Sequence, residues 1–178
     1  MSIDDATHYL QQIQAIAQAA QQGESSSREQ DSQEIFRQWA TFGVAGELYG
    51  IDVMQVKEVL RYTEITPVPG AAPGILGIIN LRGNVVTVVS TRSLFKLPPN
   101  EIDTSTRIVV VEFDDQEVLG LLVDGVDEVL NLPQSEIDRA PGLMRDDATR
   151  QFVQGVCYRD EQLIILMDLD KMLIDFRS

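Results

Sequence analysis

The chain has 178 residues, with 28 Asp and Glu against 14 Lys and Arg, which gives a formal net charge of −14. Such a charge repels phosphate backbones and anionic headgroups, so the composition disfavours binding to nucleic acid or to a membrane surface. No apolar run approaches the ~20 residues that a membrane-spanning helix needs, and we expect no direct membrane insertion. The acidic N-terminus lacks the basic segment of a signal peptide, and the single cysteine, Cys157, cannot form an internal disulfide. We therefore expect a cytoplasmic protein.

Residues 1–34 are expected to form an arm that precedes the main domain. The apolar side chains of residues 4–22 recur at three- and four-residue spacing: Ala6, Leu10, Ile13, Ala17 and Ala20. This spacing predicts an amphipathic helix with a mostly Gln polar face. Residues 23–34 are polar throughout and predict a flexible linker. We expect either a helix that docks weakly, whose removal leaves the melting temperature of the body nearly unchanged, or a helix that binds a partner.

From Phe36 onward, short β-branched runs alternate with turn signals, which predicts a mainly β body. The candidate strands in chain order are 39–44, 48–51, 75–81, 85–89 and 108–113. Arg82-Gly83-Asn84 joins the third and fourth candidates and predicts a hairpin turn. Between the second and third candidates, Val53, Val56 and Leu60 recur at helical spacing and predict a short helix that faces the core.

The body also repeats itself. Residues 48–60 align with residues 118–130 at an offset of 70, so that Gly50 matches Gly120. Residues 77–95 then match residues 155–173 in hydrophobic pattern, at an offset of 78. An ordered double match with one change of length indicates an internal duplication. Each copy is too small to be comfortably stable alone, so we expect two small β-barrels that pack on each other with a groove between them.

Catalytic signatures are missing from the sequence. No GxxxxGK[ST], GxGxxG or GxSxG motif occurs, and the single histidine, His8, lies far along the chain from Cys157. Cys157 is most simply a small buried hydrophobic residue. Acidic clusters are expected to be solvated faces, although two carboxylates suffice for some hydrolases, which leaves a carboxylate-dependent hydrolase as a remote alternative. We expect no catalytic residue, no cofactor and no metal.

Four stretches stand in order along the body: Tyr49-Gly-Ile-Asp-Val, Pro67-Val-Pro, Asn80-Leu-Arg-Gly and residues 118–130. Through them the domain of residues 35–176 resembles the CheW family of adaptors, which couple chemoreceptors to the histidine kinase CheA in bacterial chemotaxis. The resemblance implies two tandem SH3-like five-stranded β-barrels, about residues 36–104 and 105–176, and no enzymatic activity. It implies two kinds of partner, the cytoplasmic tips of chemoreceptors and the regulatory domain of CheA.

The resemblance places a receptor-binding groove beside the first hairpin, where the matching Glu58 and Arg82 are expected to lie close together. The second copy has Asp160 in place of Arg82, which suggests a role that only the first hairpin acquired. We expect apolar contacts from two short helices that flank the groove, and close approach of the receptor at two glycines: Val56, Val126, Val129, Gly77 and Gly120.

The regulatory domain of CheA has the same fold as the family, so we expect like to pair with like through apolar strand residues of the first barrel. The residues expected in this kinase-binding surface are Ile51, Val53, Val86 and Val88. The sequence departs from the family where Ser90 replaces the usual Asp of a V-D-x-R run, and this change is expected to loosen a contact to Arg92. An adaptor of another chemosensory pathway, for pilus or surface sensing, stays open as the alternative function.

Overall fold

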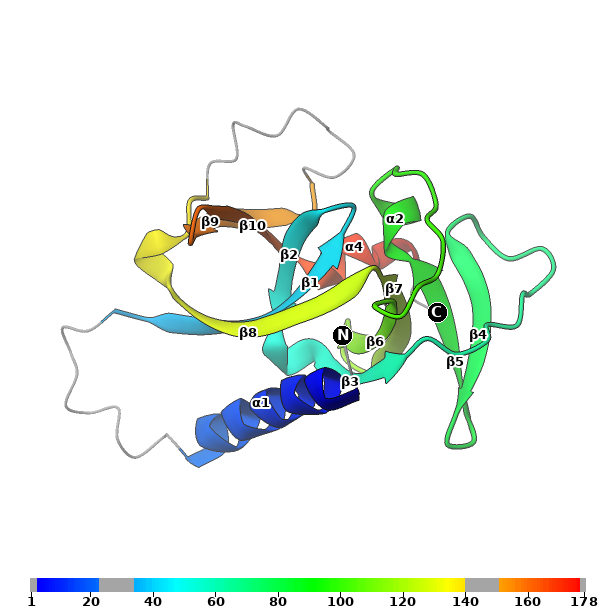
Figure 1. Cartoon of the computed structure of the whole chain (residues 1–178), viewed down its shortest axis with the longest axis horizontal. Helices are drawn as coiled ribbons and strands as arrows, with labels where there is room; N and C mark the ends of the chain where they lie inside the picture. The colour runs from blue at the N-terminus through cyan, green and yellow to red at the C-terminus, as the bar shows by residue number, and fades with distance from the viewer. Residues whose placement is uncertain (1–2, 23–33, 140–150, 177–178) are drawn as a thin grey trace.

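The computed structural model describes residues 3–22, 34–139 and 151–176, and within them ten strands form two five-stranded sheets (Figure 1). Sheet A has the order β8 (Gly125–Pro133), β1 (Phe36–Val44), β2 (Glu47–Asp52), β10 (Gln162–Met167) and β9 (Val153–Arg159). Sheet B has the order β3 (Val56–Arg61), β6 (Arg107–Phe113), β7 (Glu117–Val123), β5 (Asn84–Ser90) and β4 (Ile75–Leu81). The mainly β fold with five-stranded units is confirmed.

Helices are few and mostly short in the described part of the chain. They are α1 (Ile3–Gln22), α2 (Thr91–Leu94) and α4 (Leu169–Met172), with 3₁₀ turns η3 (Val53–Gln55), η4 (Gln134–Glu136) and η5 (Ile174–Phe176). The side chain of Ser90 accepts a hydrogen bond from the Ser93 amide and so caps α2. Asp168 caps α4 in the same way. These two caps occupy equivalent positions in the two copies, because they differ by the offset of 78.

Each sheet takes strands from both halves of the chain. Strands β1 and β2 join β8, β9 and β10 in sheet A, whereas β6 and β7 join β3, β4 and β5 in sheet B. The parallel pairing of Leu166 with Gly50 in sheet A is equivalent to that of Val88 with Gly120 in sheet B, which supports the duplication. The expected sequential division near residue 104 therefore does not separate the two sheets. Chain continuity alone could not reveal this exchange, which depends on pairings between distant segments.

The side chains of β6 and β10 alternate between two kinds of core. In β10, Ile164 and Leu166 belong to a cluster of buried residues on sheet A, whereas Ile165 and Met167 belong to a larger cluster that both sheets share. Sheet B has a third cluster of its own, and β6 alternates between it and the shared core. Because both faces of these strands are buried, their sequences are continuous apolar runs rather than alternating patterns.

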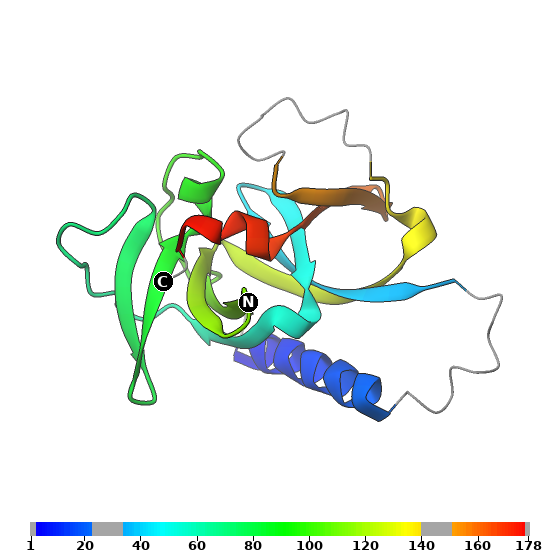
Figure 2. The same ribbon diagram turned by 180° about the vertical axis from the view of Figure 1, so that it is seen from behind.

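Backbone bridges bring the two edges of each sheet together. In sheet B, Thr66 follows β3 and exchanges two hydrogen bonds of 2.9 Å with Ile78 in β4. In sheet A, Asp138 follows β8 and exchanges two bonds of 2.9 Å with Val156 in β9. Each sheet thus curls until its first and last strands are linked, which is the closure expected of small barrels. Figure 2 shows the two units side by side, with α4 between them.

The predicted short helix through Val53, Val56 and Leu60 is wrong. Only η3 forms one 3₁₀ turn, capped by the Asp52 carboxylate, and the chain then continues as β3. A β-bulge between Val56 and Glu58 interrupts the alternation of β3. The bulge produces an apolar spacing of three that imitates a helix. The hairpin around Arg82 is confirmed, since β4 and β5 pair up to Leu81 and Asn84.

The N-terminal helix forms as predicted but is not a loosely attached arm. Helix α1 packs along β3, β8 and η3 on one side of the molecule (Figures 1 and 2). Tyr9 keeps only 2% of its surface exposed, and Ala6 and Ile13 are buried as well. The Tyr9 hydroxyl donates to the backbone oxygen of Thr41 at 3.3 Å. The expectation of a loosely docked helix is therefore wrong, and its effect on the melting temperature stays a prediction. Residues 23–33 of the predicted linker lie outside the described residues.

Candidate functional site

The first hairpin carries an exposed ion pair. A guanidinium nitrogen of Arg82, in the β4–β5 turn, donates to the carboxylate of Glu58 in β3. The Arg82 side chain is 73% exposed and that of Glu58 22% exposed. The pair links the two edge strands of sheet B, because β3 and β4 lie at opposite ends of its strand order. The structure thus brings together the two charged residues that the family resemblance had paired.

The three valines expected to flank the groove lie on strands rather than helices. Val56 lies in β3, and Val126 and Val129 lie in β8. Val56 and Val126 are buried in the shared core cluster that also contains Tyr9 and Ile13, and Val129 packs against that cluster. The surface between β3 and β8 thus exists, and helix α1 covers it. Valine is β-branched and favours strands, and these valines form part of the apolar face on which α1 packs.

The two glycines serve the fold itself. A Cβ atom on Gly77 would lie 2.1 Å from the backbone oxygen of Thr66, so Gly77 permits the bridge that closes sheet B. A Cβ atom on Gly120 would lie 2.9 Å from a methyl carbon of Ile108 inside the same sheet. Both residues are buried, and the close approach that they permit is to their own chain. A role for them in direct contact with a receptor is not supported.

The residues expected to bind a kinase are all buried. Ile51 and Val53 belong to the shared core, and Val86 and Val88 belong to the cluster inside sheet B. The expectation that they form a surface is therefore corrected: β2, which carries Ile51, is buried on both faces, whereas Val86 and Val88 lie on the inward face of β5. Cys157 is buried as predicted, and burial raises the pKa of its thiol.

Arg92 has a carboxylate partner, Asp124, that the sequence did not predict. Its Nε donates to one carboxylate oxygen of Asp124 at 3.0 Å and its Nη2 to the other at 2.6 Å. The amide of Ala45 also donates to Asp124, at 2.8 Å. The hydrogen bond from Arg92 holds the pKa of Asp124 below its ordinary value. Ser90 therefore does not leave Arg92 without a partner, since Asp124 from the other copy supplies the charge.

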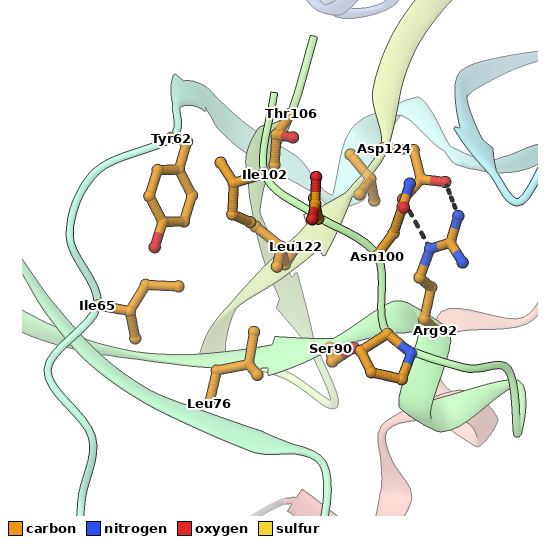
Figure 3. A pocket seen from close by; sticks show the side chains of 13 residues that line it. Tyr62, Ile65, Leu76, Ser90, Arg92, Asn100, Ile102, Thr106, Leu122 and Asp124 are labelled. Carbon is orange, nitrogen blue, oxygen red and sulfur yellow. Dashed lines mark hydrogen bonds and ion pairs between the residues drawn. The ribbon is translucent and has the colours of Figure 1, made fainter. Parts of the chain in front are cut away.

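A half-open hollow of about 270 Å³ lies beside this pair on sheet B (Figure 3). Arg92 and Asp124 stand at one end, and the remaining lining combines polar side chains, among them Asn100 and Glu101, with a group of larger apolar ones: Tyr62, Ile65, Leu76, Ile102 and Leu122. Tyr62, Leu76 and Ile102 are exposed despite their size. No sequence pattern pointed to this hollow, because its lining comes from loops and strands far apart in the chain.

Within residues 3–22, 34–139 and 151–176, no group of three or more His, Cys, Asp or Glu side chains could hold a metal ion. Over the same residues, no helix is long and apolar enough to cross a membrane. The site offers an exposed ion pair, a helix-covered surface and an apolar hollow, each of which suits contact with another protein.

An exposed ion pair on the first hairpin and exposed apolar side chains around a hollow are typical of a protein-interaction domain. A family model described as the CheW-like domain matches residues 38–176, and the chain belongs to that family.

Individual relatives agree with this assignment. The chemotaxis protein CheW of Bacillus subtilis (strain 168) is 37% identical over 133 residues, which cover 74% of this chain and 83% of that protein. The crystal structure of the scaffolding protein TtCheW from Thermoanaerobacter tengcongensis matches with a TM-score of 0.69 and 32% identity, over 78% of this chain and 93% of that chain. Protein PilI of Pseudomonas aeruginosa is 25% identical over 136 residues, 75% of each chain. The chain is thus a chemotaxis-type scaffold and not an enzyme, and these relatives give no support to a hydrolase.

Proposed function

We propose that this chain is a cytoplasmic adaptor that links the cytoplasmic tips of chemoreceptors to the regulatory domain of the kinase CheA. The observation that carries the proposal is the exposed ion pair of Glu58 and Arg82 on the first hairpin. It stands where the family resemblance implies receptor coupling, and the second copy has Asp160 at the equivalent position.

The physical chemistry of this pair favours a role in binding over a role in folding. An exposed ion pair contributes about 0–1 kcal/mol to stability, because water and side-chain entropy offset the attraction. Arg82 exposes 73% of its side chain, so the pair falls in this class. A receptor helix that covers Arg82 would remove water from it, and any acidic partner on that helix would then determine specificity and complex lifetime. Val56, Val126 and Val129 lie under α1, so they can supply apolar contacts to a receptor only where that helix is displaced.

We assign the kinase contact to the hollow on sheet B. Tyr62, Leu76 and Ile102 are exposed apolar side chains around one concavity, and the Arg92–Asp124 pair forms its polar rim. Large apolar and aromatic residues that surround a hollow, with charge at the rim, are typical of specific protein interfaces. Val86 and Val88 contribute from beneath by holding the strands that carry this surface.

The test is a pair of charge substitutions at equivalent hairpin positions. Arg82→Glu is expected to leave the fold and CheA binding unchanged and to reduce binding of a receptor tip fragment at least tenfold. Asp160→Arg is the matched control on the second hairpin and should change neither interaction. Equal receptor binding by both variants and the parent chain would contradict the receptor assignment, as would unfolding of the Arg82 variant.

A separate variant tests the kinase surface. Leu76→Asp places a charge on the exposed rim of the hollow, and it should weaken CheA binding while receptor binding persists. Thr63→Asp is a suitable control, since Thr63 is exposed on the same loop as Tyr62 and does not line the hollow. Unchanged CheA binding by the Leu76 variant would contradict the assignment.

The second candidate is an adaptor of another chemosensory pathway, and the similarity to PilI favours it. Both candidates predict the same binding chemistry, so only a cellular phenotype separates them. A deletion strain with defective swimming chemotaxis supports the first, whereas normal swimming with defective surface motility supports the second.

A further inference from the structure

Helix α1 lies on the surface that the proposed function gives to a receptor helix. Its contacts run along β3, β8 and η3, and the shared core cluster contains Tyr9 and Ile13 together with Val56 and Val126. The same apolar surface cannot hold two helices at once. The docking of α1 therefore bears directly on access to that surface.

The side of α1 that meets the body follows the pattern of a helix bound in a groove. Ala6, Tyr9 and Ile13 are buried at positions three and four residues apart, and Leu10 and Ile16 pack beside them. The outward side is exposed and uncharged at Gln11, Gln14 and Gln18. An amphipathic helix that presents a narrow row of apolar anchors is the general mode of helix-in-groove recognition.

Tyr9 is the most specific anchor in this row. Its ring is buried, and its hydroxyl donates to the backbone oxygen of Thr41 in β1, the strand that pairs with β8. Burial raises the pKa of Tyr9, and the nearby charge of Asp127 acts in the same direction, so the hydroxyl stays protonated and able to donate. The surface thus offers both an apolar recess and a hydrogen-bond acceptor to a helix.

We infer that the surface between β3 and β8 is a helix-binding surface that α1 occupies within its own chain, and that a receptor helix binds there only by displacing α1. This inference rests on the proposed receptor-binding role of that surface. The partner is an amphipathic helix with an apolar row and few charges, which α1 imitates.

Tethering makes this competition effective. A short linker gives an attached helix an effective concentration on the order of millimolar, so even a weakly bound α1 occupies the surface most of the time. A partner that needs the open form binds with an affinity reduced by the open fraction. A body that is closed about nine times in ten would therefore bind a receptor helix roughly tenfold more weakly than a permanently open one.

The experiment uses full-length chains and a soluble coiled-coil fragment of a chemoreceptor cytoplasmic tip as the probe. One variant carries Tyr9→Asp and Ile13→Asp, which places charges on the buried side of α1. The control carries Gln11→Asp and Gln14→Asp, which adds the same charge to the exposed side. Affinity for the fragment is measured together with hydrogen exchange of the backbone amides of residues 6–18, with and without the fragment.

We expect the buried-side variant to bind the fragment about tenfold tighter than the parent chain and the control to bind like the parent. In the parent, fragment binding should increase exchange in α1. Exchange in α1 that stays unchanged when the fragment binds overturns the inference and leaves the proposed function intact. Failure of the fragment to bind any of the three chains overturns both. If the buried-side variant unfolds, the exchange measurement on the parent chain decides alone.

Discussion

The hairpins β4–β5 and β9–β10 are equivalent elements of the two copies, and their side chains make different contacts across their sheets. In sheet B, Arg82 forms the ion pair with Glu58, whereas in sheet A, Arg159 donates to the backbone oxygen of Asn131 at 3.3 Å. Both turns keep positive φ angles, 50° at Arg82 and 50° at Asp160. The fold thus requires the turn conformation but not a particular charge on it. Divergence of the charge on a retained backbone is what a binding role in one copy would produce.

The short helices that follow the two hairpins, α2 and α4, also carry different charges at equivalent positions. Ser90 and Asp168 both cap a helix, and Arg92 and Asp170 follow each cap by two residues. Arg92 pairs with Asp124, whereas Asp170 accepts hydrogen bonds from Gln55 and from the backbone amide of Asp114. In each case the residue ties its helix to a neighbouring connection. Arg92 and Asp170 therefore make equivalent contacts, although one side chain is positively charged and the other negatively charged.

We expect the largest difference in the cost of equivalent substitutions at Gly77 and Gly155, the glycines that lie beside the closing bridges of sheets B and A. Gly77 has a φ of 148° and no room for a Cβ atom beside the Thr66 backbone, whereas at Gly155 the first obstacle is a methyl group of Ile137 at 2.6 Å. Gly77→Ala should cost about 3 kcal/mol or more, since backbone strain adds to overpacking. Gly155→Ala should cost about 1–2 kcal/mol.

Thermal unfolding checks this order. The melting temperature should fall by roughly 10 °C for Gly77→Ala and by less than half as much for Gly155→Ala. The reverse order would mean that sheet A, not sheet B, depends more on its edge bridge.

A smaller difference is expected between the two acidic residues that anchor the short helices. Asp124→Asn removes one charge from a two-bond pair with partly buried Arg92, so it should cost about 1–2 kcal/mol in the free energy of unfolding. Asp170→Asn should cost less than about 1 kcal/mol, because Asp170 is exposed. Denaturant titrations of both variants against the parent chain measure the two costs. Equal costs would show that the Arg92–Asp124 pair contributes no more to stability than the contacts of Asp170.

The same pair predicts a dependence on pH. Arg92 lowers the pKa of Asp124 in the folded protein, so the stabilisation is fully present above the ordinary carboxyl pKa of about 4 and is lost as the pH falls through the folded value. The difference in stability between the parent and Asp124→Asn should therefore shrink below about pH 4. Denaturant titrations at pH 7 and pH 3 check it. A difference that stays constant would show that the carboxylate charge is not what stabilises this contact.

The smallest effect on stability is expected at the hairpin tips. Arg82→Glu and Asp160→Arg should each change the free energy of unfolding by less than about 1 kcal/mol, because both side chains are exposed. Thermal melts of the two variants check this. A large loss at Arg82 alone would show that the ion pair closes the barrel, and its proposed binding role would then lose its physical basis.

Local features of the fold were predictable from the sequence, and contacts between distant segments were not. The β4–β5 hairpin has a strong turn signal and appears as predicted, and α1 follows from its periodicity. Strand exchange between the copies depends on pairings such as Leu166 with Gly50, which no local pattern encodes. The bulge at Val56 made a strand resemble a helix.

The candidate site shows the same division. Comparison of the two copies identified Arg82, which Asp160 replaces in the second copy, and the family resemblance supplied its pairing with Glu58. Strand alternation requires some of the residues assigned to the kinase surface to be core, but a continuous apolar run such as that around Ile51 does not say whether one or both faces of the strand are covered. Tyr9 was overlooked, although its spacing from Ala6 and Ile13 places it on the buried stripe of α1.

The most direct test of the central claim is receptor-controlled CheA activity in a reconstituted mixture of receptor, kinase and adaptor. With Arg82→Glu, kinase activity should no longer respond to the receptor, although the adaptor still binds CheA. Addition of Glu58→Arg reverses the polarity of the pair and should restore part of the response, because the two residues act together. A parent-like response from the Arg82→Glu variant alone would contradict the account.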